Sequence, residues 1–183
     1  MKSICVYLGA NPGNSPALTE AVVILGERIA TSGYRLVYGG SSQGLMGLLA
    51  KSAMTQGGKV TGVITNKLMT QEQPLTTLDE LIVVDTMQER KLILQQRCSA
   101  FIVMPGGLGT LEEAFDTWNA IKIGVINQPI GFLNIEGYFD GLFSFISNCE
   151  DKGFISSRQA RIPKINADPR LLLSELLEQD KIL

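Results

Sequence analysis

The chain has 183 residues, of which 16 are Lys or Arg, 18 are Asp or Glu and none is histidine, which gives a formal net charge of −2. This length predicts one domain spanning residues 1–183, and the charge balance, with no long basic run, disfavours a nucleic-acid partner. The lack of histidine excludes Ser–His and Cys–His nucleophiles and zinc bound through imidazole, so acid–base chemistry falls to carboxylates, Lys, Tyr or bound water.

Strand and helix patterns alternate along the whole chain. In the first half of the chain we expect strands at 4–8, 36–38 and 60–64, helices at 17–31 and about 45–56, and then an irregular polar segment at 66–78. In the second half we expect strands at 81–84, 100–104 and 130–134, each followed by a helix: one at 87–97, one opening with Glu112 and Glu113, and one at 139–148. A last helix is expected to be capped by Asp168, with Pro169 as its first residue. This alternation predicts an α/β fold, a single-domain Rossmann-like doubly wound parallel sheet with helices on both faces.

The cysteines and the apolar segments bear on the compartment. Cys5, Cys98 and Cys149 are widely spaced and form no Cys-x-x-Cys pair, which favours buried reduced thiols in a cytoplasmic protein. The apolar run at the start of the chain is too short for a signal peptide, and no stretch approaches the length of a membrane span. We therefore expect a cytoplasmic protein without a membrane partner.

Three of the expected strands end in glycine-rich turns, at Gly9, Gly39 and Gly106. In an open parallel sheet, ligands bind beyond the carboxyl ends of the strands, where the connections diverge. Three such turns at one edge of a sheet predict a crevice suited to a nucleotide, whereas one turn alone would be a weak indication.

The most informative turn follows the strand at 100–104. It contains Gly106, Gly107, Gly109 and Thr110 and leads into a helix. Glycine lets backbone N–H groups approach an anion closely, and a helix N-terminus carries partial positive charge, so a phosphate is the expected ligand. The segment is neither a dinucleotide Gly-x-Gly-x-x-Gly motif nor a Walker loop, and by spacing alone such a turn can also be a simple strand-to-helix connection.

As a longer string, Pro-Gly-Gly-x-Gly-Thr-x-x-Glu at 105–113 resembles the signature of the "Lonely guy" phosphoribohydrolases. Members of this family release a cytokinin or adenine base from its riboside 5′-monophosphate, and many relatives carry the label "lysine decarboxylase". The resemblance runs from residue 4 to about residue 155. It implies a nucleoside monophosphate as substrate, no metal, no organic cofactor, and a homodimer with helices 87–97 and 110–123 near its interface.

The same resemblance implies a catalytic pair, Arg90 and Glu113. The family has Met-His-x-Arg-Lys where this chain has Met-Gln-Glu-Arg-Lys at 87–91, so Gln88 stands in place of a histidine, and Lys91 is a candidate for substrate binding. Carboxylates in the first turn of a helix also interact favourably with the helix dipole, which would explain them without any chemical role. Because adjacent helical residues point about 100° apart, we expect Glu113 to face the site and Glu112 to have a structural role.

Further substrate-binding candidates rest on the resemblance. Glu72 lies in a segment similar to the family's Leu-Met-Pro-x-Glu, and Gly40 and Gly44 match the family's Gly-Gly-Gly-x-x-Gly-Leu-Met-Gly, in which Ser41 replaces the third glycine. Serine permits a tight turn but disfavours positive φ, so Ser41 predicts an altered contact there. Asn119 takes the place of a family threonine and can make similar hydrogen bonds.

Two alternatives to a hydrolase follow from the same sequence. The first is a nucleotide-binding or carrier protein on the same fold with little turnover, as in molybdenum-cofactor carriers, although a pure carrier has less need of both Arg90 and Glu113. The second is a lysine decarboxylase, which would require a Schiff-base lysine and an acidic partner for the pyridoxal phosphate ring. No segment of the sequence frames that pair.

Overall fold

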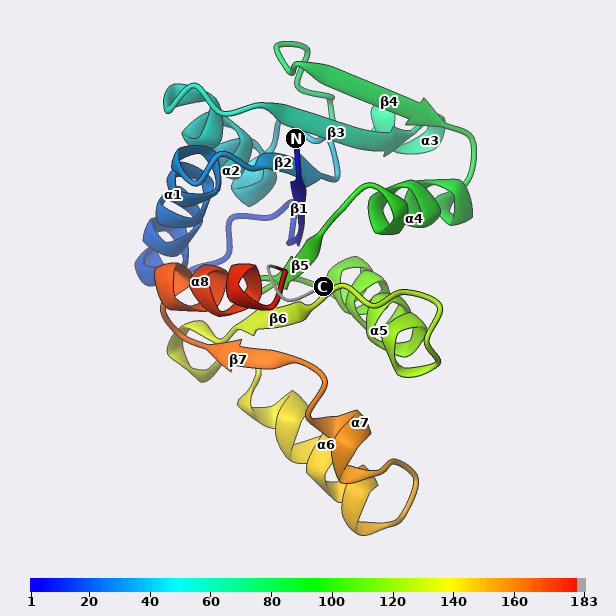
Figure 1. Cartoon of the computed structure of the whole chain (residues 1–183). Coiled ribbons are helices and arrows are strands. Elements are labelled where there is room, and N and C mark those ends of the chain that lie inside the picture. The colour runs from blue at the N-terminus through cyan, green and yellow to red at the C-terminus, as the bar shows by residue number, and fades with distance from the viewer. Residues whose placement is uncertain (181–183) are drawn as a thin grey trace.

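The computed structural model describes residues 1–180, which contain one seven-stranded sheet in the order β4-β3-β2-β1-β5-β6-β7 (Figure 1). Every pair of neighbouring strands is parallel. The strands are β1 (Ser3–Tyr7), β2 (Arg35–Tyr38), β3 (Val60–Thr65), β4 (Glu80–Val84), β5 (Ala100–Val103), β6 (Ile130–Leu133) and β7 (Lys164–Asn166).

The helices cover both faces of this sheet. They are α1 (Pro16–Thr31), α2 (Gly44–Thr55), α3 (Asn66–Met69), α4 (Met87–Gln96), α5 (Leu108–Lys122), the 3₁₀ turn η1 (Ile135–Gly137), α6 (Asp140–Asp151), α7 (Ser157–Ala160) and α8 (Pro169–Asp180). In Figure 1, α1, α2 and α8 lie on one face, and α4 and α5 lie on the other. The expected Rossmann-like doubly wound fold is confirmed.

Residues alternate between two hydrophobic layers along each central strand, as the period of a strand requires. In β1, Ile4 and Val6 pack with the layer under α1, α2 and α8, whereas Cys5 and Tyr7 pack with the layer under α4 and α5. Both sides of β1 are therefore buried, which explains why its sequence is apolar at nearly every position.

The chain order places a switch point between β1 and β5. From β1 the chain moves outward through β2, β3 and β4, then crosses back to β5 and continues outward through β6 and β7. The connections after β1 and β5 therefore diverge to opposite faces and leave room for a ligand at their carboxyl ends. The loops that begin at Gly9 and Gly106 lie at this point.

The structure differs from the expected elements at three places. Helix α5 begins at Leu108, so Gly109 and Thr110 lie in its first turn and not in the loop before it. The segment 66–78, expected to be irregular, opens with the short helix α3, which Thr65 caps through its side chain. The segment after residue 155 adds the edge strand β7, which has only three residues and no clear alternation in its sequence.

The last helix agrees with its predicted start. The Asp168 carboxylate accepts the backbone N–H groups of Arg170 and Leu171, and Pro169 is the first helical residue. Among residues 1–180, no helix is both long and apolar enough to cross a membrane.

Candidate functional site

A cleft of about 470 Å³ lies at the switch point. Its wall comes from the loops after β1 and β5, the starts of α2, α4 and α5, and the segment around α3. Seven of the predicted site residues line this cleft: Glu72, Arg90, Gly106, Gly107, Gly109, Thr110 and Glu113. The sheet therefore brings together seven positions that are up to 41 residues apart in the chain.

One end of the cleft is the N-terminus of α5. This helix has 15 residues, and its N-cap is Gly107, which provides no side-chain hydrogen bond to the first turn. The first N–H groups of a helix have no partner within the helix, so these groups are available to an anion. The Thr110 side chain is buried beside the loop, where its hydroxyl can add a further donor.

Gly106 is required by close packing in this loop. A Cβ at Gly106 would lie 2.2 Å from the Thr110 hydroxyl oxygen and 2.8 Å from the backbone nitrogen of Gly9. A Cβ at Gly107 or Gly109 would meet nothing within 4 Å, so these two glycines border the open space of the cleft. The loops after β1 and β5 thus touch at Gly9 and Gly106, and the free volume lies beyond Gly107.

Tyr138 contributes to this end of the cleft from the segment after β6, although it was not among the predicted site residues. It follows η1 after β6, lines the cleft, and donates its hydroxyl to the Gly106 carbonyl at 2.7 Å. The sequence signal was available, because β6 lies next to β5 and ends at the same edge of the sheet. A Tyr five residues after that strand end was close enough to reach the loop.

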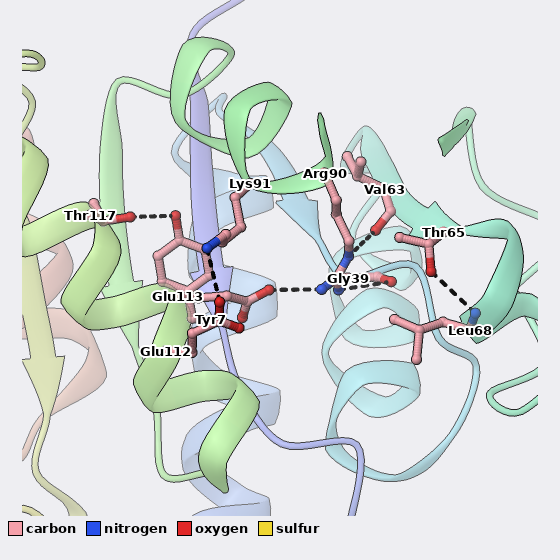
Figure 2. A network of polar contacts seen from close by, with 10 residues as sticks. All are labelled: Tyr7, Gly39, Val63, Thr65, Leu68, Arg90, Lys91, Glu112, Glu113 and Thr117. Atoms are coloured by element: carbon pink, nitrogen blue, oxygen red, sulfur yellow. Dashed lines mark hydrogen bonds and ion pairs between the residues drawn. The ribbon is translucent and has the colours of Figure 1, made fainter. Parts of the chain in front are cut away.

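The charged centre of the cleft is an ion pair between Arg90 and Glu113, shown in Figure 2. The Arg90 Nη1 and the Glu113 Oε1 are 2.9 Å apart, and both side chains are almost fully buried. Arg90 also donates Nε to the Val63 carbonyl at 2.8 Å and Nη2 to the Gly39 carbonyl at 3.4 Å. The guanidinium is therefore fixed by the ends of β2 and β3, and it in turn fixes the carboxylate.

Burial changes the proton affinity of Glu113. The pKa of this carboxyl is raised from 4.5 to about 7, mainly by loss of solvent, with the charge of Arg90 opposing the rise and the charges of Glu112 and Glu72 adding to it. A carboxyl with a pKa near neutrality can both accept and return a proton under physiological conditions. This property, together with its place in the cleft, makes Glu113 the strongest candidate for acid–base chemistry among the described residues.

The neighbouring pair, Lys91 and Glu112, lies on the outer side of the two helices. The Lys91 Nζ is 2.9 Å from the Glu112 Oε1 and 3.6 Å from the Asp116 Oδ1, and these contacts raise the pKa of Lys91. Glu112 is exposed, and neither Lys91 nor Glu112 lines the cleft. The helical spacing thus separates the two adjacent glutamates as expected, whereas Lys91 is placed in a link between α4 and α5.

Gly40, Gly44 and Asn119 lie outside the lining of the cleft. Gly40 has φ +82° at the end of β2, and a Cβ at Gly44 would lie 1.6 Å from the carbonyl oxygen of Ala10. These two glycines therefore allow the loops around the cleft to pack. Asn119 is exposed beside a separate cavity that is also lined by Trp118 and Lys122, because it lies on the far end of α5.

The remaining wall of the cleft is apolar. It includes Leu45 and Met46 at the start of α2, Leu68 in α3 and Met87 at the start of α4. Methionine is flexible and polarizable, so such a wall suits a flat ring. The cleft therefore has a helix N-terminus at one end, a buried Arg–Glu pair in its floor and an apolar wall.

Fold and cleft together define a Rossmann-like α/β protein whose cleft joins a helix N-terminus to a buried titratable carboxyl group. Comparisons with known proteins agree. A family model described as "Possible lysine decarboxylase" matches residues 46–176. The chain is 37% identical over 179 residues to the cytokinin riboside 5′-monophosphate phosphoribohydrolase LOG7 of Arabidopsis thaliana. This alignment covers 98% of this chain and 82% of the relative. It is 40% identical over 155 residues to LOG1 of the same organism, in an alignment that covers 85% of this chain and 73% of that relative.

The chain therefore belongs to the family of the cytokinin riboside 5′-monophosphate phosphoribohydrolases, whose model carries the lysine decarboxylase description. Among solved structures, a molybdenum cofactor binding protein from Rippkaea orientalis is similar with a TM-score of 0.70 at 22% identity, over 98% of this chain and 97% of that one. The molybdenum cofactor carrier protein of Chlamydomonas reinhardtii also has a TM-score of 0.70, at 20% identity and over the full length of both chains. At these identities the likeness concerns the fold.

Proposed function

We propose that this protein is a hydrolase that cleaves the N-glycosidic bond of a purine riboside 5′-monophosphate, giving the free base and ribose 5-phosphate. The observation that carries the proposal is the buried Arg90–Glu113 pair beside the N-terminus of α5, in one cleft. Membership of the phosphoribohydrolase family supports the same reaction.

The proposed mechanism assigns each end of the cleft a task. The N–H groups of Gly107 and the first turn of α5, with the Thr110 hydroxyl, bind the 5′-phosphate. Breaking the glycosidic bond develops positive charge on the ribose, which the Glu113 carboxylate stabilises. Glu113 also orients the ribose hydroxyls or the attacking water, and Arg90 holds that carboxylate in place. Water supplies the hydroxyl group that the ribose gains, and the base leaves with a proton.

The first test of this proposal is release of base, followed by liquid chromatography. The substrates are AMP and isopentenyladenosine monophosphate, with the two matching ribosides as controls. Free base from the monophosphates alone supports the hydrolase and the phosphate requirement, and the ratio of the two rates separates cytokinin activation from general AMP hydrolysis. A folded protein that binds AMP and releases no base would instead be a nucleotide carrier.

The name of the family model points to a different reaction, which the cleft does not favour. A decarboxylase of the pyridoxal phosphate type needs a lysine for the Schiff base. Among residues 1–180, no lysine lines the cleft, and Lys91, which lies nearest in sequence to Arg90, is paired with Glu112 and Asp116. We therefore prefer glycosidic hydrolysis.

We expect the rate of hydrolysis to fall with acid through about pH 7, the pKa to which burial raises Glu113. If the carboxylate form is required, kcat drops about tenfold per pH unit below that value. The same shift means that, between pH 4.5 and about 7, the folded protein keeps a proton that the unfolded chain has lost, so the stabilising contribution of this group declines as pH rises through that window.

This pH dependence is measured as kcat from about pH 5 to about pH 9. Glu112→Gln is the matched control, because the charge of Glu112 raises the pKa of Glu113 and its removal moves the acid limb slightly downward without abolishing it. A flat profile across this range would mean that ionisation of Glu113 is not required.

We further propose a homodimer in which α4 and α5 form the contact. Leu92 on α4 is 52% exposed and Phe115 on α5 is 39% exposed, although both are large apolar side chains. Leu92→Glu is expected to shift the protein to a monomer in size-exclusion chromatography with light scattering. Phe154→Glu, at an even more exposed apolar position between α6 and α7, is expected to leave the dimer intact. A monomeric wild-type protein at micromolar concentration would contradict this proposal.

A cytoplasmic location also remains a proposal. It is supported by the cysteines, because Cys5, Cys98 and Cys149 are all free and the first two are buried. Free thiols persist in a reducing compartment.

A further inference from the structure

The segment that carries Glu72 is fastened to the turn at the end of β2. The Ser42 N–H donates to the Gln73 carbonyl at 2.9 Å, and the Leu75 N–H donates to the Gly40 carbonyl at 3.1 Å. Between these two backbone contacts, Ser41 and Pro74 form an isolated antiparallel bridge. The loop after α3 is thus held against the turn as a short added strand.

The side chain of Ser41 adds a contact that glycine cannot make. Its hydroxyl donates to the Glu72 carbonyl at 3.2 Å and accepts the Gln43 N–H at 3.1 Å. Ser41 is fully buried, and the Tyr38 hydroxyl donates to its carbonyl at 3.1 Å. Ser41 does not adopt positive φ, whereas Gly40 before it does at +82°, so the serine fits this turn without backbone strain.

The Glu72 side chain points the other way, into the cleft. Its Oε2 is buried, and among the residues that the structure describes it is the only buried side-chain polar atom without a hydrogen-bond partner. A buried carboxylate oxygen without a donor is costly, so the site is complete only when a donor arrives. The charge of Glu72 also acts on Glu113, which places both carboxylates at the same cleft.

We propose that Ser41 is a positioning residue that tethers the Glu72 backbone, so that the Glu72 carboxylate stands ready for a hydroxyl or amino donor of the ligand. The inference rests on the proposed function for the identity of that ligand, a purine riboside monophosphate. A tether of this kind orders the segment before the ligand binds, so binding no longer carries that entropy cost. Loss of the tether therefore weakens binding more than it slows the chemical step.

The test is a double-mutant cycle with Ser41→Gly and Glu72→Ala, measured as KM and kcat for base release. Ser41→Gly alone is expected to raise KM about fivefold, the value of one net hydrogen bond, with kcat nearly unchanged. In the Glu72→Ala background the same change is expected to have almost no further effect, because there is no longer a side-chain acceptor to position. Equal effects of Ser41→Gly in both backgrounds would overturn the proposal.

Two additional measurements keep this test independent of turnover and of folding. Hydrogen exchange of residues 71–75 is expected to accelerate in Ser41→Gly, and unchanged exchange there would overturn the tether. Ser52→Ala removes another buried hydroxyl, which bonds only to the Leu48 carbonyl on α2, and is expected to leave exchange at 71–75 and KM unaltered. If the wild-type protein releases no base, the proposed reaction fails, and the cycle is repeated with the dissociation constant for AMP.

Discussion

Replacing Glu113 by glutamine is expected to lower kcat for base release roughly 10²–10⁴-fold while AMP binding stays nearly intact. Glutamine has the same shape and can still accept the hydrogen bond that the Arg90 Nη1 donates at 2.9 Å. What the variant loses is the negative charge that stabilises the ribose cation, and that charge matters only in the transition state. The substitution therefore separates catalysis from binding.

The experiment compares kcat with the dissociation constant of AMP measured by calorimetry. Glu112→Gln is the matched control, since this neighbouring glutamate is exposed and bonds to Lys91 outside the cleft. We expect this control to retain turnover within a few-fold of the wild type. A parallel loss of binding and turnover in Glu113→Gln would assign Glu113 to substrate binding alone.

Replacing Arg90 by methionine is expected to reduce base release by a similar order and to move its acid limb to higher pH. Among the groups that lower the pKa of Glu113, the positive charge of Arg90 has the largest effect. Without it, burial raises that pKa further, and the carboxyl holds its proton more tightly. At neutral pH most molecules would then carry a protonated Glu113. Activity that returns in alkali would be the distinctive result.

The same variant is expected to be less stable by about 3–5 kcal/mol, because one partner of a buried ion pair is removed and the Val63 and Gly39 carbonyls lose a donor. Thermal unfolding measures this loss. Arg97→Met is the control, since Arg97 pairs with Glu80 at the surface, where such a pair contributes about 0–1 kcal/mol.

The double variant with Glu113→Gln shows whether the two residues act as a unit. We expect the loss of kcat in Arg90→Met/Glu113→Gln to be close to that of either single variant, because each one already disables the pair.

An acid limb that stays near pH 7 in Arg90→Met would show that another group sets the pH dependence.

The local sequence was sufficient for most of the fold. Alternating apolar strands and amphipathic helices depend on periodicity, and glycine marks turns that need either positive φ, as at Gly40 after β2, or close packing, as at Gly106 after β5. The short strand β7 was missed because three residues carry almost no periodic signal and its pairing with β6 is decided by tertiary contact.

The candidate site was predictable to a similar extent. The motif at 105–113 marked the helix N-terminus, and the helical angle between neighbours separated Glu113 from Glu112. Lys91 and Asn119 were assigned to the substrate from the resemblance, yet the structure places both outside the cleft lining. The direction in which they point depends on which face of α4 and α5 meets the sheet, and a string of residues does not specify that face when its apolar stripe is weak.

The sequence by itself determined the parallel α/β architecture, the glycine-rich turn that leads into α5 and the absence of histidine chemistry, because each follows from residue type or short-range spacing. Only the tertiary structure decided that Arg90 reaches Glu113, that Ser41 holds the Glu72 segment and that Tyr138 bonds to Gly106. These contacts join residues 23, 31 and 32 positions apart, through different strand ends that meet at one edge of the sheet. The physical reason is that parallel strands bring the ends of distant segments together, and their burial there sets both the hydrogen-bond partners and the pKa of Glu113.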